Sequence, residues 1–214
     1  HDHLSGKRLR LQQQYLLVSA SLQSILNIHY KQYKTYRNLP EKVSIHINDT
    51  HPALCVPELM RILVDENDYE WDEAWDITCR TLSYTNHTVM SEALERWSVD
   101  LFQEQLPRIY SITQEINRRL MEKLQQVYPG DWGKLNYMAV IAEGQVRMAN
   151  LCLACCHKIN GVSPLHTQIL QDGIFHHYYV LDNDRFTNLT NRIAYPPALC
   201  HAHPPLTTHP TAPH

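Results

Sequence analysis

The sequence predicts an α/β fold that is rich in helices and poor in strands. Long stretches carry apolar residues at steps of three and four, which is the spacing of one face of a helix. One short segment instead alternates apolar and polar residues, as a half-buried strand does. With 6 glycines in 214 residues, the chain also has few tight turns.

The first helix is expected over residues 7–36. Its apolar positions recur at helical spacing and form one stripe: Leu11, Tyr15, Val18, Leu22, Ile25 and Leu26. Leu39-Pro40 should end this region, since proline cannot extend a helix and restricts the residue before it. The chain therefore begins with one long amphipathic helix.

A short strand is expected at residues 43–47, where β-branched Val43, Ile45 and Ile47 alternate with polar residues. The strand ends in a polar turn over residues 48–52. The next apolar stripe has helical spacing and consists of Val56, Leu59, Met60, Leu63 and Val64. This segment therefore predicts a strand, a turn and a helix in direct succession.

Three further helices are expected in the middle of the chain. One begins near residues 71–73, with Asp72 as a candidate N-cap, and continues through Trp75, Ile77, Cys79 and Leu82. Two more fit residues 93–110 and 112–127. A turn should follow them at Pro129-Gly130-Asp131.

The last third of the chain is less regular. Residues 148–159 are apolar and short of charge, which suits a buried strand or a buried helix equally. Residues 164–171 fit a short helix with Pro164 in its first turn. Six of the 12 prolines lie beyond residue 193, where no periodic apolar face remains. We therefore expect a folded region over residues 1–193, either one domain or part of a larger one, and a disordered or aberrant Pro/His-rich tail over residues 194–214.

Composition and charge exclude several classes of protein. Lys+Arg 19 against Asp+Glu 22 gives a formal net charge of -3, so the basic excess that holds nucleic-acid phosphates is missing. No apolar run approaches the ~20 residues of a membrane span, and the start of the chain lacks the pattern of a signal peptide. The 6 cysteines are irregularly spaced, which favours reduced, mostly buried thiols over a disulfide framework. We expect a soluble cytoplasmic protein without nucleic-acid or membrane partners.

The first polar cluster stands at the carboxyl end of the expected strand. Asn48, Asp49 and His51 occupy the position at which open α/β sheets bind ligands. A carboxylate and an imidazole two positions apart can each hydrogen-bond a sugar hydroxyl. The alternative is that Asp49 or Thr50 only caps the following helix.

The second polar cluster is residues 84–88, which contains Asn86 and His87 and lies between expected helices. These residues could bind a ligand, or they could form a loop whose polar groups hydrogen-bond only to one another. Residue types alone do not choose between these interpretations.

The run CLACCH at residues 152–157 resembles a haem or zinc motif only superficially. A c-type haem site requires histidine directly after the second cysteine, and Cys156 intervenes. A zinc site requires a second ligand pair, and the sequence has no companion CxxC. An apolar core segment with small thiols is therefore favoured, and no metal is expected. Residue chemistry alone indicates an α/β protein with two polar loops suited to a small polar ligand.

Longer runs resemble a known family. The segments INDTHPALCVPELMRILVD, WDEAWDITCRTLSYTNHTVMSEALERW and LPRIYSITQEIN resemble the α-glucan (glycogen, starch or maltodextrin) phosphorylases. The runs RLRLQQQYLLVSASLQ, MANLCLACCHKINGVSPLHTQIL and DRFTNLTN fit the same family. The similarity covers residues 6–191, and matches this long and ordered are far more specific than a short motif.

The resemblance implies that the chain is an internal, helix-rich and Rossmann-like portion of the N-terminal domain of a two-domain, type-B glycosyltransferase fold. The family transfers a glucosyl unit from the non-reducing end of an α-1,4-glucan to inorganic phosphate, which gives α-D-glucose 1-phosphate with retention. It requires pyridoxal 5'-phosphate, whose lysine belongs to the C-terminal domain, so no cofactor-binding or catalytic residue is expected in this chain. The full-length enzyme is expected to be a homodimer, and the isolated chain to be inactive.

The resemblance also assigns residues. His87 matches the family histidine that contacts the glucosyl unit, chiefly its 6-hydroxyl. Asp49 and His51 match the NDTHP loop, which lines the sugar cleft toward the acceptor side. Asn48 and Asn86 are expected to support these loops.

Some positions depart from the family pattern. Arg192 stands where a TNGI segment has glycine, and the two arginines that follow that segment are absent. Pro164 and the pair His176-His177 stand where charged residues are expected. Two alternatives therefore stay open. One is a non-catalytic carbohydrate-binding or structural α/β module, and the other is a truncated or frameshifted reading frame without function.

Overall fold

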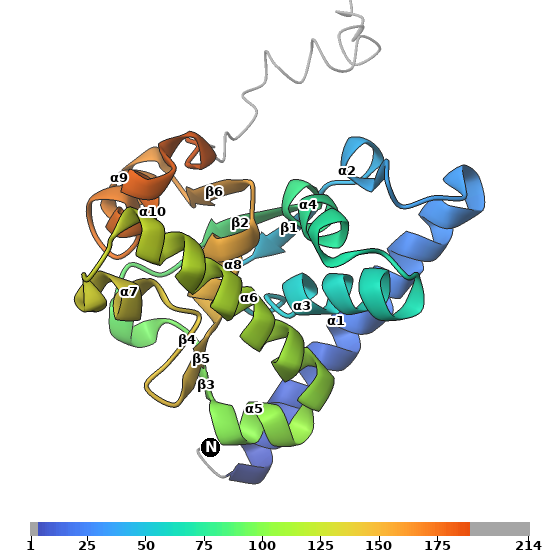
Figure 1. Cartoon of the computed structure of the whole chain (residues 1–214), viewed down its shortest axis with the longest axis horizontal. Helices are drawn as coiled ribbons and strands as arrows, with labels where there is room; N and C mark the ends of the chain where they lie inside the picture. The colour runs from blue at the N-terminus through green and yellow to red at the C-terminus, as the bar shows by residue number, and fades with distance from the viewer. Residues whose placement is uncertain (1–3, 189–214) are drawn as a thin grey trace, which may run out of the picture.

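The computed structural model describes residues 4–188, and a parallel sheet of three strands organises them (Figure 1). The strands pair in the order β1-β2-β6, with β1 at Ile45–Asn48, β2 at Leu82–Asn86 and β6 at Lys158–Gly161. In register, Ile47 lies beside Tyr84 and Tyr84 beside Ile159, and all three side chains are fully buried. Because the strands are parallel, their carboxyl ends meet at one edge of the sheet.

A second, smaller sheet is antiparallel. Its strands β3 (Arg96–Ser98), β4 (Ile141–Ala142) and β5 (Gln145–Arg147) have the order β3-β5-β4. The turn between β4 and β5 is Glu143-Gly144, with φ of 54° and 71°. A two-residue hairpin turn needs positive φ at both central positions, and glycine adopts it without steric cost.

Helices surround the two sheets. They are α1 (Leu4–Tyr33), α2 (Leu39–Lys42), α3 (Cys55–Arg61), α4 (Trp71–Thr81), α5 (Val99–Gln105), α6 (Pro107–Val127), α7 (Trp132–Met138), α8 (Met148–Cys155), α9 (Pro164–Asp172) and α10 (His176–Leu181). A π-helical turn, η1 (Ile62–Glu66), extends α3, and η2 (Ser91–Ala93) and η3 (Asn183–Arg185) are 3-10 turns. Among residues 4–188, no helix combines the length and apolar character needed to cross a membrane.

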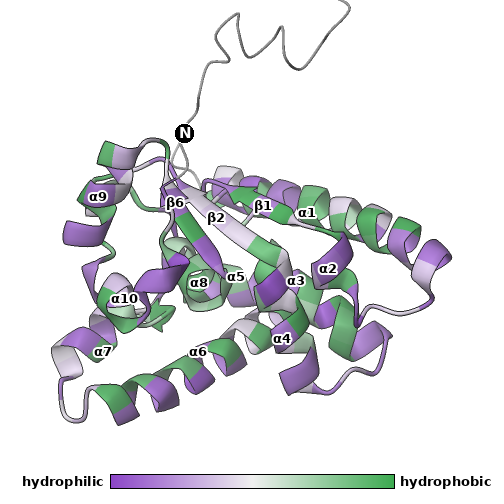
Figure 2. Cartoon of the chain, turned by 90° about the horizontal axis from the view of Figure 1, so that it is seen from above, coloured by the Kyte–Doolittle hydropathy of each residue, from purple (hydrophilic) through white to green (hydrophobic). Residues whose placement is uncertain are grey.

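Helix α3 lies at the centre of the core. It contacts α1, α4, α6 and α8, and Figures 1 and 2 show the sheet and α3 between the long helices α1 and α6. Six of its seven residues, Cys55 through Met60, are buried.

One of these buried residues, Glu58, is charged. Its carboxylate accepts hydrogen bonds from Tyr15 Oη at 2.9 Å and Ser19 Oγ at 2.7 Å. Arg61 donates two more, so the buried carboxylate is fully paired.

The structure confirms three of the expected helices: the long first helix, the helix after the first strand, and the helix with Pro164 in its first turn. The first strand is confirmed with a shift from residues 43–47 to 45–48. Leu39-Pro40 does not simply end a helix. These residues begin the short helix α2, because the fixed φ of proline suits a first helical turn.

Other boundaries were predicted wrongly. The two helices expected at residues 93–110 and 112–127 divide at Leu106 instead, because Pro107 lacks an N–H and starts α6. Residues 93–98 hold the end of η2 and strand β3. Asp72 is not an N-cap: Glu70 occupies that position, and Asp72 lies in the first turn of α4.

The apolar segment 148–159 contains both of the structures that its sequence allowed. Helix α8 ends at Cys155, and strand β6 starts at Lys158. Cys152, Cys155 and Cys156 are buried thiols of the core, as expected. The tail at residues 194–214, the substitution at Arg192 and the sixth cysteine, Cys200, lie outside the described residues.

Candidate functional site

The expected polar residues meet at the carboxyl edge of the parallel sheet. Asn48 is the last residue of β1, and Asn86 is the last residue of β2. Asp49 and His87 follow them directly. Residues 84–86 were expected to be a loop between helices, and they form a strand instead. The edge is the place where open α/β sheets bind ligands.

The turn after β1 has a defined and unusual conformation. Asp49 has φ of 62°, the left-handed region that aspartate tolerates better than most residues. Its backbone N–H donates to the carbonyl of Thr85 at 2.8 Å, and its carboxylate accepts from the backbone N–H of Thr50 at 2.6 Å. The helix-capping alternative is wrong, because the N-cap position of α3 is Leu54. The turn therefore holds Asp49 and the exposed His51 at the edge of the sheet.

His87 and Asn48 are in direct contact. The His87 Nε2–H donates to Asn48 Oδ1 at 2.5 Å, and both side chains are exposed. Because an amide oxygen only accepts, this bond places the imidazole proton on Nε2 and leaves Nδ1 as an acceptor. An acceptor nitrogen at an exposed edge is suited to a hydroxyl donor.

Asn86 lies beneath them and does not contact solvent. Its Nδ2 donates to the hydroxyl of Tyr84 at 2.9 Å, and its Oδ1 accepts from the backbone N–H of Thr88 at 2.7 Å. Burial raises the pKa of the Tyr84 phenol well above its usual value, so this group stays neutral and hydrogen-bonded. Asn86 therefore shapes the backbone that carries His87.

The third strand ends in a loop with its own histidine. The Val162 N–H donates to His166 Nδ1 at 3.0 Å, and the Gly161 N–H donates to Thr167 Oγ1 at 2.9 Å. A Cβ on Gly161 would lie 2.8 Å from His166 Cγ, so the loop needs glycine there. Burial lowers the pKa of His166, and the nearby His87 lowers it further. Sequence reasoning missed His166, because the strand that places it was not separated from α8.

A cavity of about 620 Å³ opens beside this edge. Asp49, Thr50, His51 and Thr88 are among the residues that line it, whereas Asn48, Asn86 and His87 do not line it. The lining also includes residues from distant segments, namely Lys7, Arg10, Glu95, Arg96 and Trp97. These residues were also missed, because no local pattern connects α1 with β3.

The lining residues from these distant segments are charged and aromatic. The Arg10 guanidinium lies 5.9 Å from the centre of the Trp97 ring and pairs with Glu95 at 3.0 Å. An aromatic ring beside groups that donate and accept hydrogen bonds suits a polar organic ligand. Within residues 4–188, no group of three or more His, Cys, Asp or Glu side chains is placed to hold a metal ion.

Comparison with known proteins gives a consistent result. The family model described as carbohydrate phosphorylase matches residues 1–211. Glycogen phosphorylase of Bacillus subtilis is 51% identical over 204 residues, which are 95% of this chain and 26% of that protein. Glycogen phosphorylase of Chlamydia trachomatis is 47% identical over 90% of this chain, and the human muscle form is 46% identical over 90%; each match covers 24% of the relative. The chain thus spans about a quarter of the length of the curated relatives it matches.

Proposed function

Because this chain belongs to the carbohydrate phosphorylase family, we propose that it supplies part of the glucan-binding cleft of a phosphorylase that acts on α-1,4-glucans. The complete enzyme would transfer a glucosyl unit from the non-reducing end to inorganic phosphate and release α-D-glucose 1-phosphate. Residues 1–193 would belong to one of the two Rossmann-like halves of a type-B glycosyltransferase fold, and the complete polypeptide would form a homodimer. The observation that supports this function is the meeting of five polar residues at one edge of a parallel sheet, two of them at a cavity of about 620 Å³.

His87 is proposed to orient the glucosyl unit. Its Nε2–H is held by Asn48, so its Nδ1 is the ring atom free to accept from a sugar hydroxyl. A hydrogen bond to a hydroxyl that does not react positions the sugar, and positioning is a large part of transfer catalysis. His87 is therefore a positioning group in this proposal.

Asp49 and His51 are proposed to contact the acceptor side of the glucan, because both line the cavity. The strained turn and the Asp49–Thr50 hydrogen bond fix the direction of the carboxylate. Asn48 and Asn86 are proposed as supports. Asn48 orients the imidazole, and both polar atoms of the buried Asn86 side-chain amide form hydrogen bonds inside the protein. The proposal thus separates two supporting amides from three ligand-binding side chains.

Pyridoxal 5'-phosphate is the cofactor that the family implies, and the lysines among residues 4–188 do not fit its anchor. A Schiff-base lysine needs a desolvated or cationic environment that makes its amine nucleophilic at neutral pH. Six of the seven lysines in this range are exposed, and the half-buried Lys134 pairs with Asp131 at 3.4 Å. We propose that a part of the protein outside these residues holds the cofactor.

Calorimetric titration with maltopentaose tests the glucan-binding proposal on this chain. With one half of the cleft, we expect a Kd of about 1 mM. His87→Ala and Asp49→Asn should each weaken binding by about 10-fold. His177→Ala is the matched control, because α10 contributes neither to the carboxyl edge of the sheet nor to the cavity; this variant should bind as the unmodified chain does. Equal binding by all three variants, or equal binding of a β-1,4-linked cellopentaose, would contradict the proposal.

A further inference from the structure

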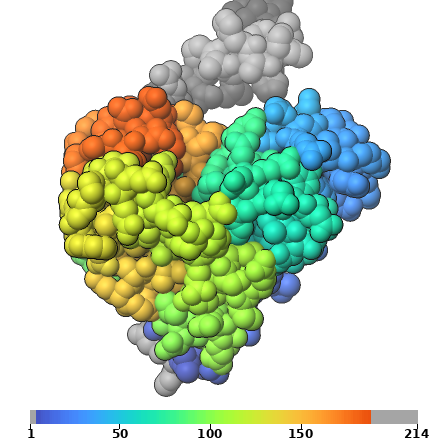
Figure 3. All heavy atoms as spheres, in the orientation of Figure 1, coloured from blue at the N-terminus to red at the C-terminus, as the bar shows by residue number. Residues whose placement is uncertain are grey.

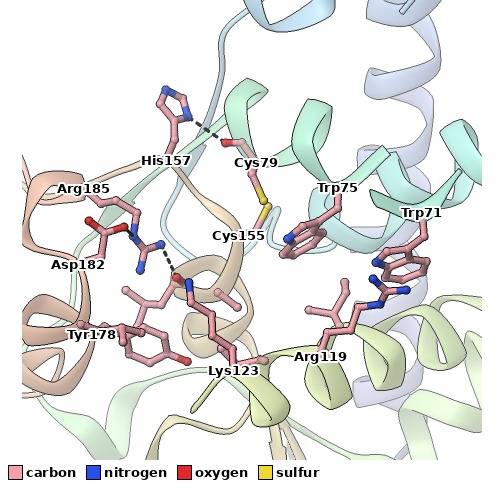
Figure 4. Close-up of a pocket in the computed structure, with 15 residues that line it drawn as sticks. Trp71, Trp75, Cys79, Arg119, Lys123, Cys155, His157, Tyr178, Asp182 and Arg185 are labelled. Carbon is pink, nitrogen blue, oxygen red and sulfur yellow. Dashed lines mark hydrogen bonds and ion pairs between the residues drawn. The ribbon is translucent and has the colours of Figure 1, made fainter. Parts of the chain in front are cut away.

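Two thiols from distant parts of the sequence face each other on the side of the molecule away from the sheet edge described above. Cys79 lies near the end of α4, and Cys155 is the last residue of α8. Figure 4 shows their sulfur atoms directed at each other, and both side chains line the same cavity. Both cysteines are free.

The backbone around the pair is fixed. Helix α4 leads directly into β2, α8 leads through His157 into β6, and these strands are neighbours in the sheet. The His157 Nδ1–H donates to the carbonyls of Cys79 at 3.0 Å and Leu82 at 2.8 Å. The His157 N–H also donates to the carbonyl of Leu82 at 3.2 Å. These hydrogen bonds fix the backbone at the end of α4 against the residues that follow α8, and so keep the two cysteines on neighbouring segments.

The pair is reachable from outside. A cavity of about 310 Å³ lies between α4, α6, α8 and α10, and Cys79 and Cys155 both line it together with Trp75, Lys123 and Tyr178. Figure 3 shows α4 and α6 meeting on this face of the molecule. Cys79 is half-buried, whereas Cys155 and the other three described cysteines are buried. A small reagent in the cavity therefore meets Cys79 first.

We propose that Cys79 and Cys155 form a peroxide-sensitive dithiol that closes to a disulfide. The Cys79 sulfur, as thiolate, attacks one oxygen of hydrogen peroxide; the O–O bond breaks and gives a sulfenic acid and water. The Cys155 sulfur then attacks the Cys79 sulfur, and the hydroxyl leaves as a second water with the Cys155 proton. In sum, two thiols and one hydrogen peroxide give one disulfide and two waters.

Burial raises the pKa of the Cys155 thiol, so the second step should be the slower one and should accelerate at alkaline pH. The product would cross-link α4 to α8 near the amino ends of β2 and β6. Because the two sulfurs already face each other (Figure 4), we expect closure to need little backbone movement. The loop that it closes runs from residue 79 to residue 155, and a loop of this length constrains the unfolded chain strongly. This modification site is independent of the proposed glucan cleft.

Peptide mapping of the whole chain after exposure to hydrogen peroxide tests the proposal. Trypsin should release residues 62–80, which contain Cys79 as their only cysteine, and residues 148–158, which contain three cysteines including Cys155. After free thiols are blocked, the main cross-linked product should join these two peptides, and fragmentation should place the bond at Cys155. The melting temperature of the oxidised chain should rise by about 5 °C or more, and a phosphine reductant should reverse the rise.

Variants separate this pair from its neighbours. Cys79→Ser should abolish the cross-link, and its half-buried position tolerates a hydroxyl. Cys55→Ala, whose cysteine lies in the core on α3, is the control and should keep the cross-link. A disulfide within residues 148–158, a link from 62–80 to any other peptide, or oxidation of Cys79 beyond the sulfenic acid without a cross-link would overturn the proposal.

Discussion

The His87 imidazole donates a hydrogen bond to the side-chain oxygen of Asn48 at 2.5 Å, which joins the residue after β2 to the last residue of β1. The bond fixes the tautomer of His87 and the direction of its ring. We expect Asn48→Ala to release the ring and to weaken maltopentaose binding by about 2- to 10-fold, since a single neutral hydrogen bond is lost. Because Asn48 is exposed, its loss should leave the urea midpoint unchanged. A large fall in that midpoint would assign Asn48 to folding instead.

Gly161 should be required for the loop that carries His166. In Gly161→Ala, the new Cβ would lie 2.8 Å from His166 Cγ and 2.9 Å from the backbone N of Thr167. We expect a loss of about 1–3 kcal/mol in the free energy of unfolding, measured by urea denaturation. Gly133→Ala is the control, because its Cβ meets only Asp131 Oδ1 at 3.7 Å and its position lies in helix α7. The control should be neutral or slightly stabilising.

Glu58 should contribute strongly to stability. Its carboxylate has no solvent exposure and is bound by Arg61, Tyr15 and Ser19. Glu58→Gln removes the charge and leaves Arg61 without its buried partner, which should cost about 3 kcal/mol. The exposed pair of Glu104 with Arg8 provides the control, and Glu104→Gln should change stability by less than about 1 kcal/mol. Equal effects of the two substitutions would argue against a buried ion pair at Glu58.

His166 should make the fold sensitive to acid. Burial lowers its pKa in the folded chain below the usual value of about 6.5, so the unfolded chain binds the proton more readily. The contribution of this group is complete above about pH 6.5 and is lost as the pH falls toward its folded pKa. The free energy of unfolding, measured by denaturation at pH 7.5 and at pH 5.5, should differ less between the two pH values for His166→Asn than for the unmodified chain. His177, whose pKa burial also lowers, needs a parallel variant, because it contributes in the same direction.

In a polypeptide that continues through the second domain, His87→Ala should reduce the turnover of phosphorolysis by about 100-fold, as expected for a misplaced substrate. Asp49→Asn should instead raise the glucan concentration for half-maximal rate. Steady-state kinetics with a parallel assay of bound cofactor would check both. If His87→Ala lost only the cofactor, a position in the sugar pocket would be wrong.

The sequence predicted those elements whose apolar residues follow a regular period. Helix α1 shows its buried positions at steps of three and four, and Pro164 marks the start of α9. Strand β2 could not be found in this way. By its spacing Leu82 was assigned to the preceding helix, and the polar residues after it are typical of a loop. All five residues of β2 are nevertheless buried, and the side chains of Thr85 and Asn86 form hydrogen bonds inside the protein. For example, Thr85 donates to Asn160 at 2.7 Å.

The site was predictable only in part. The rule for strand ends and the family resemblance both led to Asp49, and the resemblance alone singled out His87. The lining residues Arg10 and Trp97 were not predictable, because they are far apart in the sequence and meet only in the folded chain. The approach of Cys79 to Cys155 was not predictable for the same reason, since the sheet order brings α4 and α8 together.

The most direct test of the glucan-binding edge is an NMR titration of the histidine ring signals with maltopentaose. The account predicts that the His87 and His51 signals move in a saturable way, while those of His157 and His177, which lie elsewhere, stay fixed. Cellopentaose at the same concentrations should move none of them. If the His87 and His51 signals stayed fixed up to about 10 mM maltopentaose, well above the expected Kd, the carboxyl edge of this sheet would not be a glucan-binding site.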